Sequence, residues 1–185
     1  KKKNGIIFVG NVEDRKKGII YLLKAMTLTK HRVTLTIVDG GAPTRSMVPH
    51  LINKLGLNDR VTFTGKIPIE KLIHLYSINE MAVLPSLYEG FGFPAAEAMA
   101  CELPVITTTA GALPEVVGEH MKTGYLVPPR RADAIAEGID FLLDNPDLRE
   151  EMGKAARKRV LSIFTWENAA KELVAMYEEV IHAHR

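Results

Sequence analysis

Two glutamates lie on either side of a glycine-rich turn in the stretch YEGFGFPAAEAMA, residues 88–100. Glu89 comes just before the turn, and Glu97 is expected in the first turn of the helix after it. A carboxylate can accept two hydrogen bonds from a vicinal diol such as a ribose, which suits Glu97. Glu89 lies across the turn and suits a different part of the same ligand. The alternative is that Glu97 complements the helix dipole and Glu89 is solvated.

The predicted helix in this stretch also has a start that favours an anion. Pro94 suits the first helical position, because its missing N–H costs nothing there. Free N–H groups and a partial positive charge at a helix start attract a phosphate. Ala95 and Ala96 leave room for such a group.

A basic loop follows the first predicted strand, in GNVEDRKKG at residues 10–18. Arg15, Lys16 and Lys17 could neutralise a diphosphate and stabilise it as a leaving group. A solvated basic loop is an equally good interpretation. The loop matches neither the P-loop nor the dinucleotide fingerprint, since the second and third glycines are missing.

Two further polar segments end predicted strands. DGGAPT at residues 39–44 is either a phosphate-binding turn or a simple β-turn. TTTAGALPEVVG at residues 107–118 offers hydroxyls from Thr107 to Thr109. Glu115 opens a short predicted helix there, and helix capping is favoured over a role in the site.

The composition is that of an ordinary globular domain, with 46% hydrophobic and 25% charged residues among 185. A net charge of +2 is too small to indicate nucleic acid or a membrane surface as a partner.

Cys101 is the only cysteine, which excludes an intrachain disulfide, and we expect it to be buried. The six histidines lack ligand spacing, so no metal site is expected. No signal peptide is visible, and a cytoplasmic location is expected.

Short apolar strands alternate with amphipathic helices along the first two-thirds of the chain. The strands read as continuous apolar runs, which is typical of parallel strands buried on both faces. The sequence therefore predicts an α/β fold, a Rossmann-like doubly wound parallel sheet with helices on both faces. In the first helix, Ile20, Leu23 and Met26 are expected to share the buried face. The predicted strands are 5–10, 33–39, 61–65, 81–86, 103–108 and 124–128, and the predicted helices are 17–29, 47–57, 68–78, 94–100, 113–118, 132–144, 147–162 and 166–182.

The segment LPSLYEGFGFPAAEAMACELPVITTTAGALPEVV, residues 84–117, resembles the signature region of the family-4 retaining glycosyltransferases, within the group 1 glycosyl transferases. In that family two glutamates separated by seven residues flank a Gly-Phe-Gly turn, as Glu89 and Glu97 do. The supporting motifs follow in order: FVG…KG, IVDGGAP, VTFTG and GYLVPP. The resemblance covers residues 5–180.

The resemblance implies a GT-B fold, in which two Rossmann-like domains face each other across a cleft. Residues 1–185 resemble only the C-terminal half, which binds the sugar nucleotide. The N-terminal acceptor domain would be absent from this chain. The final helices resemble the segment that crosses back to that domain. Without the cleft, we expect residues 1–185 alone to transfer little or no sugar.

The resemblance also implies a role for each matching residue. Glu97 would bind the ribose, while Glu89 and Lys17 would be the catalytic residues. Asn11 stands where the family usually has arginine, and the loop to Lys17 is one residue longer, so Lys16 is an alternative phosphate partner. The donor sugar would be bound by Glu89, Gly90, Phe91 and Gly92. The diphosphate would be bound by Arg15, Lys17, Phe93, Pro94 and Ala95. The nucleobase would lie against Lys66 and Ile67.

The implied activity is transfer of a sugar, with retention, from a UDP- or GDP-sugar to an unidentified glycan, lipid or small-molecule acceptor. No metal and no cofactor would be needed. The acceptor would bind through the missing domain, nucleic acid is not an expected partner, and any peripheral membrane association would involve regions outside this chain. The alternatives are a GT-B sugar-nucleotide epimerase and a non-catalytic binding module.

Overall fold

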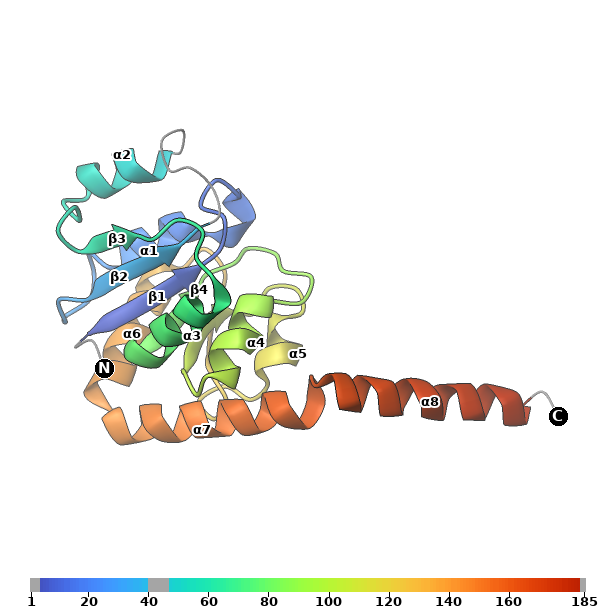
Figure 1. The fold of residues 1–185 in the computed structure, drawn as a ribbon. Coiled ribbons are helices and arrows are strands. Elements are labelled where there is room, and N and C mark those ends of the chain that lie inside the picture. The colour runs from blue at the N-terminus through green and yellow to red at the C-terminus, as the bar shows by residue number, and fades with distance from the viewer. Residues whose placement is uncertain (1–3, 40–46, 184–185) are drawn as a thin grey trace.

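A computed structural model describes residues 4–39 and 47–183 of the chain (Figure 1). The glycine-rich part of the predicted 39–44 motif lies outside the described residues. The described strands are β1 (Gly5–Val9), β2 (Thr34–Val38), β3 (Val61–Phe63), β4 (Met81–Leu84), β5 (Val105–Thr108) and β6 (Tyr125–Val127). The described helices are the 3-10 helix η1 (Arg15–Lys17) and α1 (Ile19–Ala25), α2 (Met47–Lys54), α3 (Ile69–Ile78), α4 (Phe93–Ala100), α5 (Leu113–Val117), α6 (Ala132–Asp144), α7 (Pro146–Ile163) and α8 (Trp166–Ala183).

The strands form one parallel sheet in the order β3-β2-β1-β4-β5-β6. The predicted Rossmann-like doubly wound fold is therefore confirmed. The strand order reverses between β1 and β4, which pair through Ile6 with Met81 and Ile7 with Ala82.

A hydrophobic core lies on each face of the sheet. Ile6 faces a core built with α1, α2 and α6, whereas the adjacent Ile7 faces a core built with α3, α4, α5 and α7. Successive strand side chains point to opposite faces, so continuous apolar strands serve both cores. Figure 1 shows α7 running beneath α4 and α5.

The first helix is shorter than the predicted 17–29. Leu23 and Met26 are buried as expected, but Ile19 takes the place of Ile20 in the buried face. Gly18 adopts the left-handed conformation, so η1 ends there and α1 begins after it. Ile20 and Leu28, which we expected in or beside the buried face, are 42% and 56% exposed. The buried face follows the i, i+3, i+4, i+7 spacing from Ile19 onward. Its residues are Ile19, Leu22, Leu23 and Met26.

Helix α8 extends away from the rest of the domain as a continuation of α7 (Figure 1). None of its residues is buried. Trp166 at its start is 89% exposed. Six further large apolar side chains are about half exposed, and they are Leu173, Val174, Met176, Tyr177, Val180 and Ile181. The predicted helix at 166–182 is thus present, and Asn168 near its start donates to the Leu161 and Ser162 carbonyls of α7.

Candidate active site at the switch point of the sheet

The site forms where the strand order reverses. Because β1 and β4 are parallel neighbours, the loops at residues 10–18 and 85–92 leave the same edge of the sheet side by side. Ligands of doubly wound sheets bind in the crevice at this point. The basic loop and the first glutamate, which the sequence predicts at separate strand ends, therefore come together.

Lys17 and Glu89 form an ion pair in this crevice. Nζ of Lys17 lies 2.8 Å from Oε2 and 3.1 Å from Oε1 of Glu89. The Ser86 hydroxyl also donates to Oε2, at 3.2 Å. The two charged side chains are only 22% and 16% exposed, so salt screens the pair less than a surface pair. The cavity that the two side chains help to line has a free volume of only about 10 Å³.

Gly111 allows the backbone of Glu89 to pass close to the start of α5. Its φ is 59°, and a Cβ at this position would lie 2.2 Å from the Glu89 carbonyl oxygen. The N–H of Ala112 donates to the same oxygen at 3.0 Å. The position of Glu89 is therefore fixed through its backbone as well as its carboxylate.

Two threonine hydroxyls at the end of β5 support the Glu89 loop. The Thr107 hydroxyl donates to the Leu84 carbonyl at 2.8 Å, and the Thr108 hydroxyl donates to the Ser86 carbonyl at 2.5 Å. Both threonines are fully buried. Of the three hydroxyls that the sequence offers here, only that of Thr109 belongs to an exposed residue.

Local hydrogen bonds order the basic loop that carries Lys17. Asn11 Oδ1 accepts from the Glu13 N–H at 2.8 Å, and Asp14 Oδ1 accepts from the Lys16 N–H at 2.9 Å. The Leu87 N–H donates to the Lys16 carbonyl at 2.6 Å, which ties the two loops together. The Asn11 side chain thus acts in the turn of its own loop.

Helix α4 begins directly after the glycine turn. Gly92 is its N-cap, with φ 99°. Pro94 is the second helical residue and not the first as predicted, because the helix already starts at Phe93. The N–H groups of Ala95 and Ala96 donate to the Gly92 carbonyl at 2.9 and 3.2 Å. The helix start therefore offers an anion the Phe93 N–H and the helix dipole, which is fewer donors than the sequence predicts.

Glu97 lies in the second turn of α4, so the prediction that it lies in the first turn was wrong. Gly92 caps a helix that starts at Phe93, and this start places Glu97 at its fifth position. The Tyr76 hydroxyl from α3 donates to Oε2 of Glu97 at 3.1 Å. Glu97 is half-buried, between the two helices.

The turn between the two glutamates is open to solvent and lined by aromatic rings. Gly90 is exposed, and the Phe93 side chain is 68% exposed. The Phe91 ring lies 4.8 Å from the Phe93 ring and packs edge-on against Phe164 at 5.4 Å. Phe164 follows the last residue of α7, so the turn contacts the junction of α7 and α8.

Lys66 and Ile67, the residues expected at the nucleobase, follow β3 at the same edge of the sheet. Lys66 is exposed, whereas Ile67 packs against the core that contains Tyr76. β3 lies three strands from β4, a separation of roughly 14 Å. That span suits a nucleotide lying across the strand ends.

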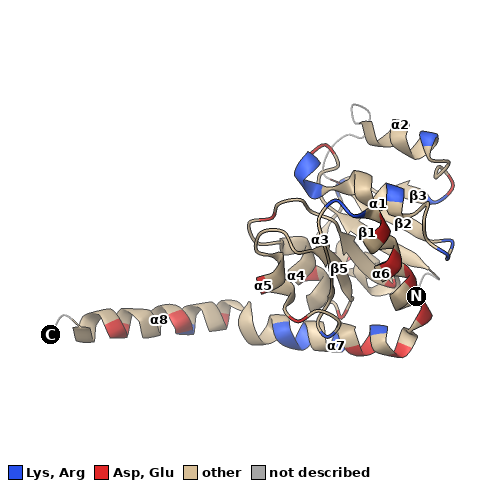
Figure 2. Cartoon of the chain, turned by 180° about the vertical axis from the view of Figure 1, so that it is seen from behind, with Lys and Arg blue, Asp and Glu red and all other residues tan. Residues whose placement is uncertain are grey.

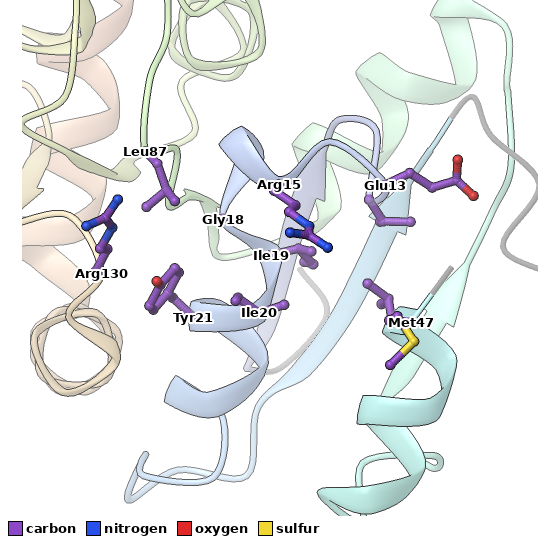
Figure 3. Close-up of a pocket in the computed structure, with 11 residues that line it drawn as sticks. Glu13, Arg15, Gly18, Ile19, Ile20, Tyr21, Met47, Leu87 and Arg130 are labelled. Atoms are coloured by element: carbon purple, nitrogen blue, oxygen red, sulfur yellow. The ribbon is translucent and has the colours of Figure 1, made fainter. Parts of the chain in front are cut away.

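A separate pocket of about 760 Å³ lies on the other side of the basic loop (Figure 3). Arg15 points into it with Ile19 and Met47, and Arg130 lies at its opposite end. Figure 2 shows the basic residues of η1 beside α1. The structure therefore places Arg15 away from the Lys17–Glu89 pair. We assign the site to the crevice rather than to this pocket, because the crevice holds the paired charges.

Among residues 4–39 and 47–183, no group of three or more His, Cys, Asp or Glu side chains could hold a metal ion. Within the same residues, no helix is both long enough and apolar enough to cross a membrane. Cys101 is half-buried at the end of α4, not buried as we expected. Burial raises the pKa of its thiol.

Sequence reasoning missed two residues of the site. Ser86 stands three positions before Glu89, and its place at a strand end could have indicated it. Tyr76 lies in IHLYSI, where an aromatic residue at helical spacing is typical of a core position. No local pattern distinguishes it from core residues.

The family model for glycosyl transferases group 1 matches residues 1–159. The chain therefore belongs to this family of glycosyltransferases, and its sheet has the Rossmann-like fold of one GT-B half.

Individual relatives agree with this membership. The chain is 36% identical, over 97% of its length, to an MMP alpha-(1->4)-mannosyltransferase from Mycolicibacterium hassiacum, and it covers 44% of that protein. It resembles the structure of a sucrose-phosphate synthase from Thermosynechococcus elongatus, with a TM-score of 0.86 and 38% identity, over 97% of this chain and 46% of that one. The chain thus spans about half the length of the curated relatives it matches.

A C-terminal domain of a group 1 family protein from Francisella tularensis is similar over most of both chains. The TM-score is 0.78 and the identity is 29%, over 88% of this chain and 86% of that one. A comparable domain has therefore been crystallised as a separate unit.

Proposed function

We propose that this chain is the donor-binding domain of a retaining glycosyltransferase that uses a UDP- or GDP-sugar. One observation carries the proposal: Lys17, Glu89 and the start of α4 meet at the switch point of the sheet. Glu97 follows on the same helix. The cation and the helix start suit the diphosphate of a sugar nucleotide, and the two carboxylates suit its sugar and its ribose.

Each part of the donor has a partner in this arrangement. The diphosphate would bind between Lys17 and the Phe93 N–H, where positive charge is available. The ribose would donate to Glu97, and the nucleobase would lie toward Lys66 and Ile67. The donor sugar would lie over the turn at Gly90, Phe91 and Gly92, within reach of Glu89.

The chemistry follows from the charges that develop during transfer. As the bond between the anomeric carbon and the diphosphate breaks, Lys17 and the helix dipole stabilise the departing negative charge. Glu89 orients the sugar and stabilises positive charge at the anomeric carbon, without forming a covalent adduct. The acceptor attacks from the face that the diphosphate leaves, which gives retention. No metal is needed in this mechanism.

The acceptor would bind to an N-terminal domain outside residues 1–185, and that domain would complete the cleft. Such an enzyme would act in the cytoplasm, and any membrane contact would involve regions outside this chain. The relatives are named for different products, a mannoside and sucrose phosphate among them, so the acceptor class stays open.

Product analysis with the complete protein tests this proposal. A panel of UDP- and GDP-sugars would be screened by thermal shift, because ligands that bind the folded state raise its stability. The anomeric configuration of the product from the best donor would then be read by NMR. We expect transfer with retention and its loss in Glu89→Gln. Inversion would contradict the mechanism, a free epimerised sugar would favour an epimerase, and unchanged transfer in Glu89→Gln would favour a binding module.

A further inference from the structure

Tyr76 is almost completely buried, yet its hydroxyl points at a residue of the candidate site. The side chain is 1% exposed and packs in the core under α4. Its hydroxyl lies 3.1 Å from Oε2 of Glu97, and the Pro94 carbonyl lies at 3.5 Å. The distance to Glu97 is that of a normal hydrogen bond, whereas 3.5 Å is at the outer limit. Glu97 is thus the main acceptor.

This hydrogen bond fixes one oxygen of a flexible carboxylate. The terminal torsion of glutamate is broad, so an unsupported side chain samples many carboxylate orientations. No other described group donates to Glu97, which leaves Oε1 able to accept from a ligand. Burial and the Glu97 charge raise the pKa of Tyr76, so the hydroxyl keeps its proton and remains a donor at ordinary pH.

We propose that Tyr76 is a positioning residue that holds Oε2 of Glu97 so that Oε1 meets the ribose diol of the bound nucleotide. The inference rests on the proposed function, because it takes Glu97 as the ribose partner. It assigns a role in binding to a side chain from α3, the helix before the glutamate motif. The two parts of Tyr76 thus have different roles: the ring packs in the core, and the hydroxyl orients the Glu97 carboxylate.

The test compares nucleotides with and without the diol. UDP and GDP, and their 2′,3′-dideoxy forms, would be titrated by calorimetry into residues 1–185 and into Tyr76→Phe. A hydrogen bond to a charged group contributes enough to change affinity about tenfold. We expect Tyr76→Phe to weaken binding of the ribonucleotide about tenfold and binding of the dideoxynucleotide less than twofold. Glu97→Gln should do the same, and adding Tyr76→Phe to it should cost little more.

Tyr125→Phe is the matched control, since Tyr125 lies at the start of β6 and should not change either affinity. The compared quantity is the ratio of the affinities of one variant for the two nucleotides. Partial unfolding lowers both affinities by the same factor, so it does not change this ratio. Equal losses for both nucleotides in Tyr76→Phe, or no loss, would overturn the positioning role while leaving the proposed function intact. If Glu97→Gln and Tyr76→Phe both kept the wild-type difference in affinity between the ribonucleotide and the dideoxynucleotide, the ribose role of Glu97 would instead be contradicted.

Discussion

Lys17 and Glu89 are 72 residues apart in sequence, yet Lys17 Nζ contacts both carboxylate oxygens of Glu89, at 2.8 and 3.1 Å. If Lys17 binds a diphosphate, Glu89 competes with that diphosphate for the lysine. We therefore predict that Glu89→Gln binds UDP or GDP more tightly than the wild type, about threefold or more, because the lysine no longer has to leave an ion pair. Titration calorimetry with the nucleotide alone measures this.

Lys17→Met should have the opposite effect and weaken nucleotide binding at least tenfold, since a charge-assisted contact to phosphate is lost. Glu115→Gln serves as a control for the glutamate change, because Glu115 is exposed on α5. Weaker UDP and GDP binding by Glu89→Gln would show that Glu89 does not compete with the diphosphate.

Gly111→Ala should destabilise the domain more than the same change at another left-handed glycine. Gly111 and Gly56 have φ values of 59° and 67°, but only at Gly111 would the new Cβ meet backbone, the Glu89 carbonyl. We predict a loss of about 1 kcal/mol in unfolding free energy for Gly56→Ala, from the left-handed backbone alone. Gly111→Ala should lose at least about 2 kcal/mol more. Urea unfolding measures both, and equal losses would contradict the close approach.

Tyr76 should make the domain less stable in alkali. The pKa of Tyr76 in the folded state is raised above the ordinary 10.0, chiefly by burial. Above about pH 10 the unfolded chain loses this proton while the folded chain keeps it, so the unfolding free energy falls as pH rises. The slope is up to about 1.4 kcal/mol per pH unit. Tyr76→Phe should lack this contribution, and parallel pH profiles of the two proteins from pH 9 to 11 would contradict it.

Removal of α8 should barely affect the stability of the domain. The helix has no buried residue, so ending the chain at Thr165 should change the unfolding free energy by less than about 1 kcal/mol. The exposed apolar side chains should promote weak self-association, which the truncation should reduce. Sedimentation velocity at several concentrations would detect this, and a large fall in melting temperature would show that α8 packs on the domain.

The sequence predicts the layers of the fold and the edge of the sheet at which the site lies. Apolar strands alternating with helices are sufficient for a parallel sheet, and parallel strands end at one edge. The sequence does not show that β1 and β4 are neighbours, because pairing depends on long-range packing. The contact between Lys17 and Glu89 therefore had to come from the structure.

The errors have local physical causes. The first helix was predicted to start at residue 17 because Lys17, directly before an apolar run with helical spacing, gives no sign that the helix starts later. The left-handed Gly18 sets the true start, and the buried face moved from Ile20 to Ile19. Tyr76 was missed because a buried tyrosine has the same sequence pattern whether or not its hydroxyl is used.

Nucleotide binding by residues 1–185 tests the central claim most directly. UDP and GDP would be titrated by calorimetry into the folded domain, with Glu97→Gln and Lys17→Met in parallel. The account predicts saturable binding of at least one nucleotide at or below millimolar concentration, weakened by both substitutions. A folded domain that gives no binding heat with either nucleotide at millimolar concentration would contradict it.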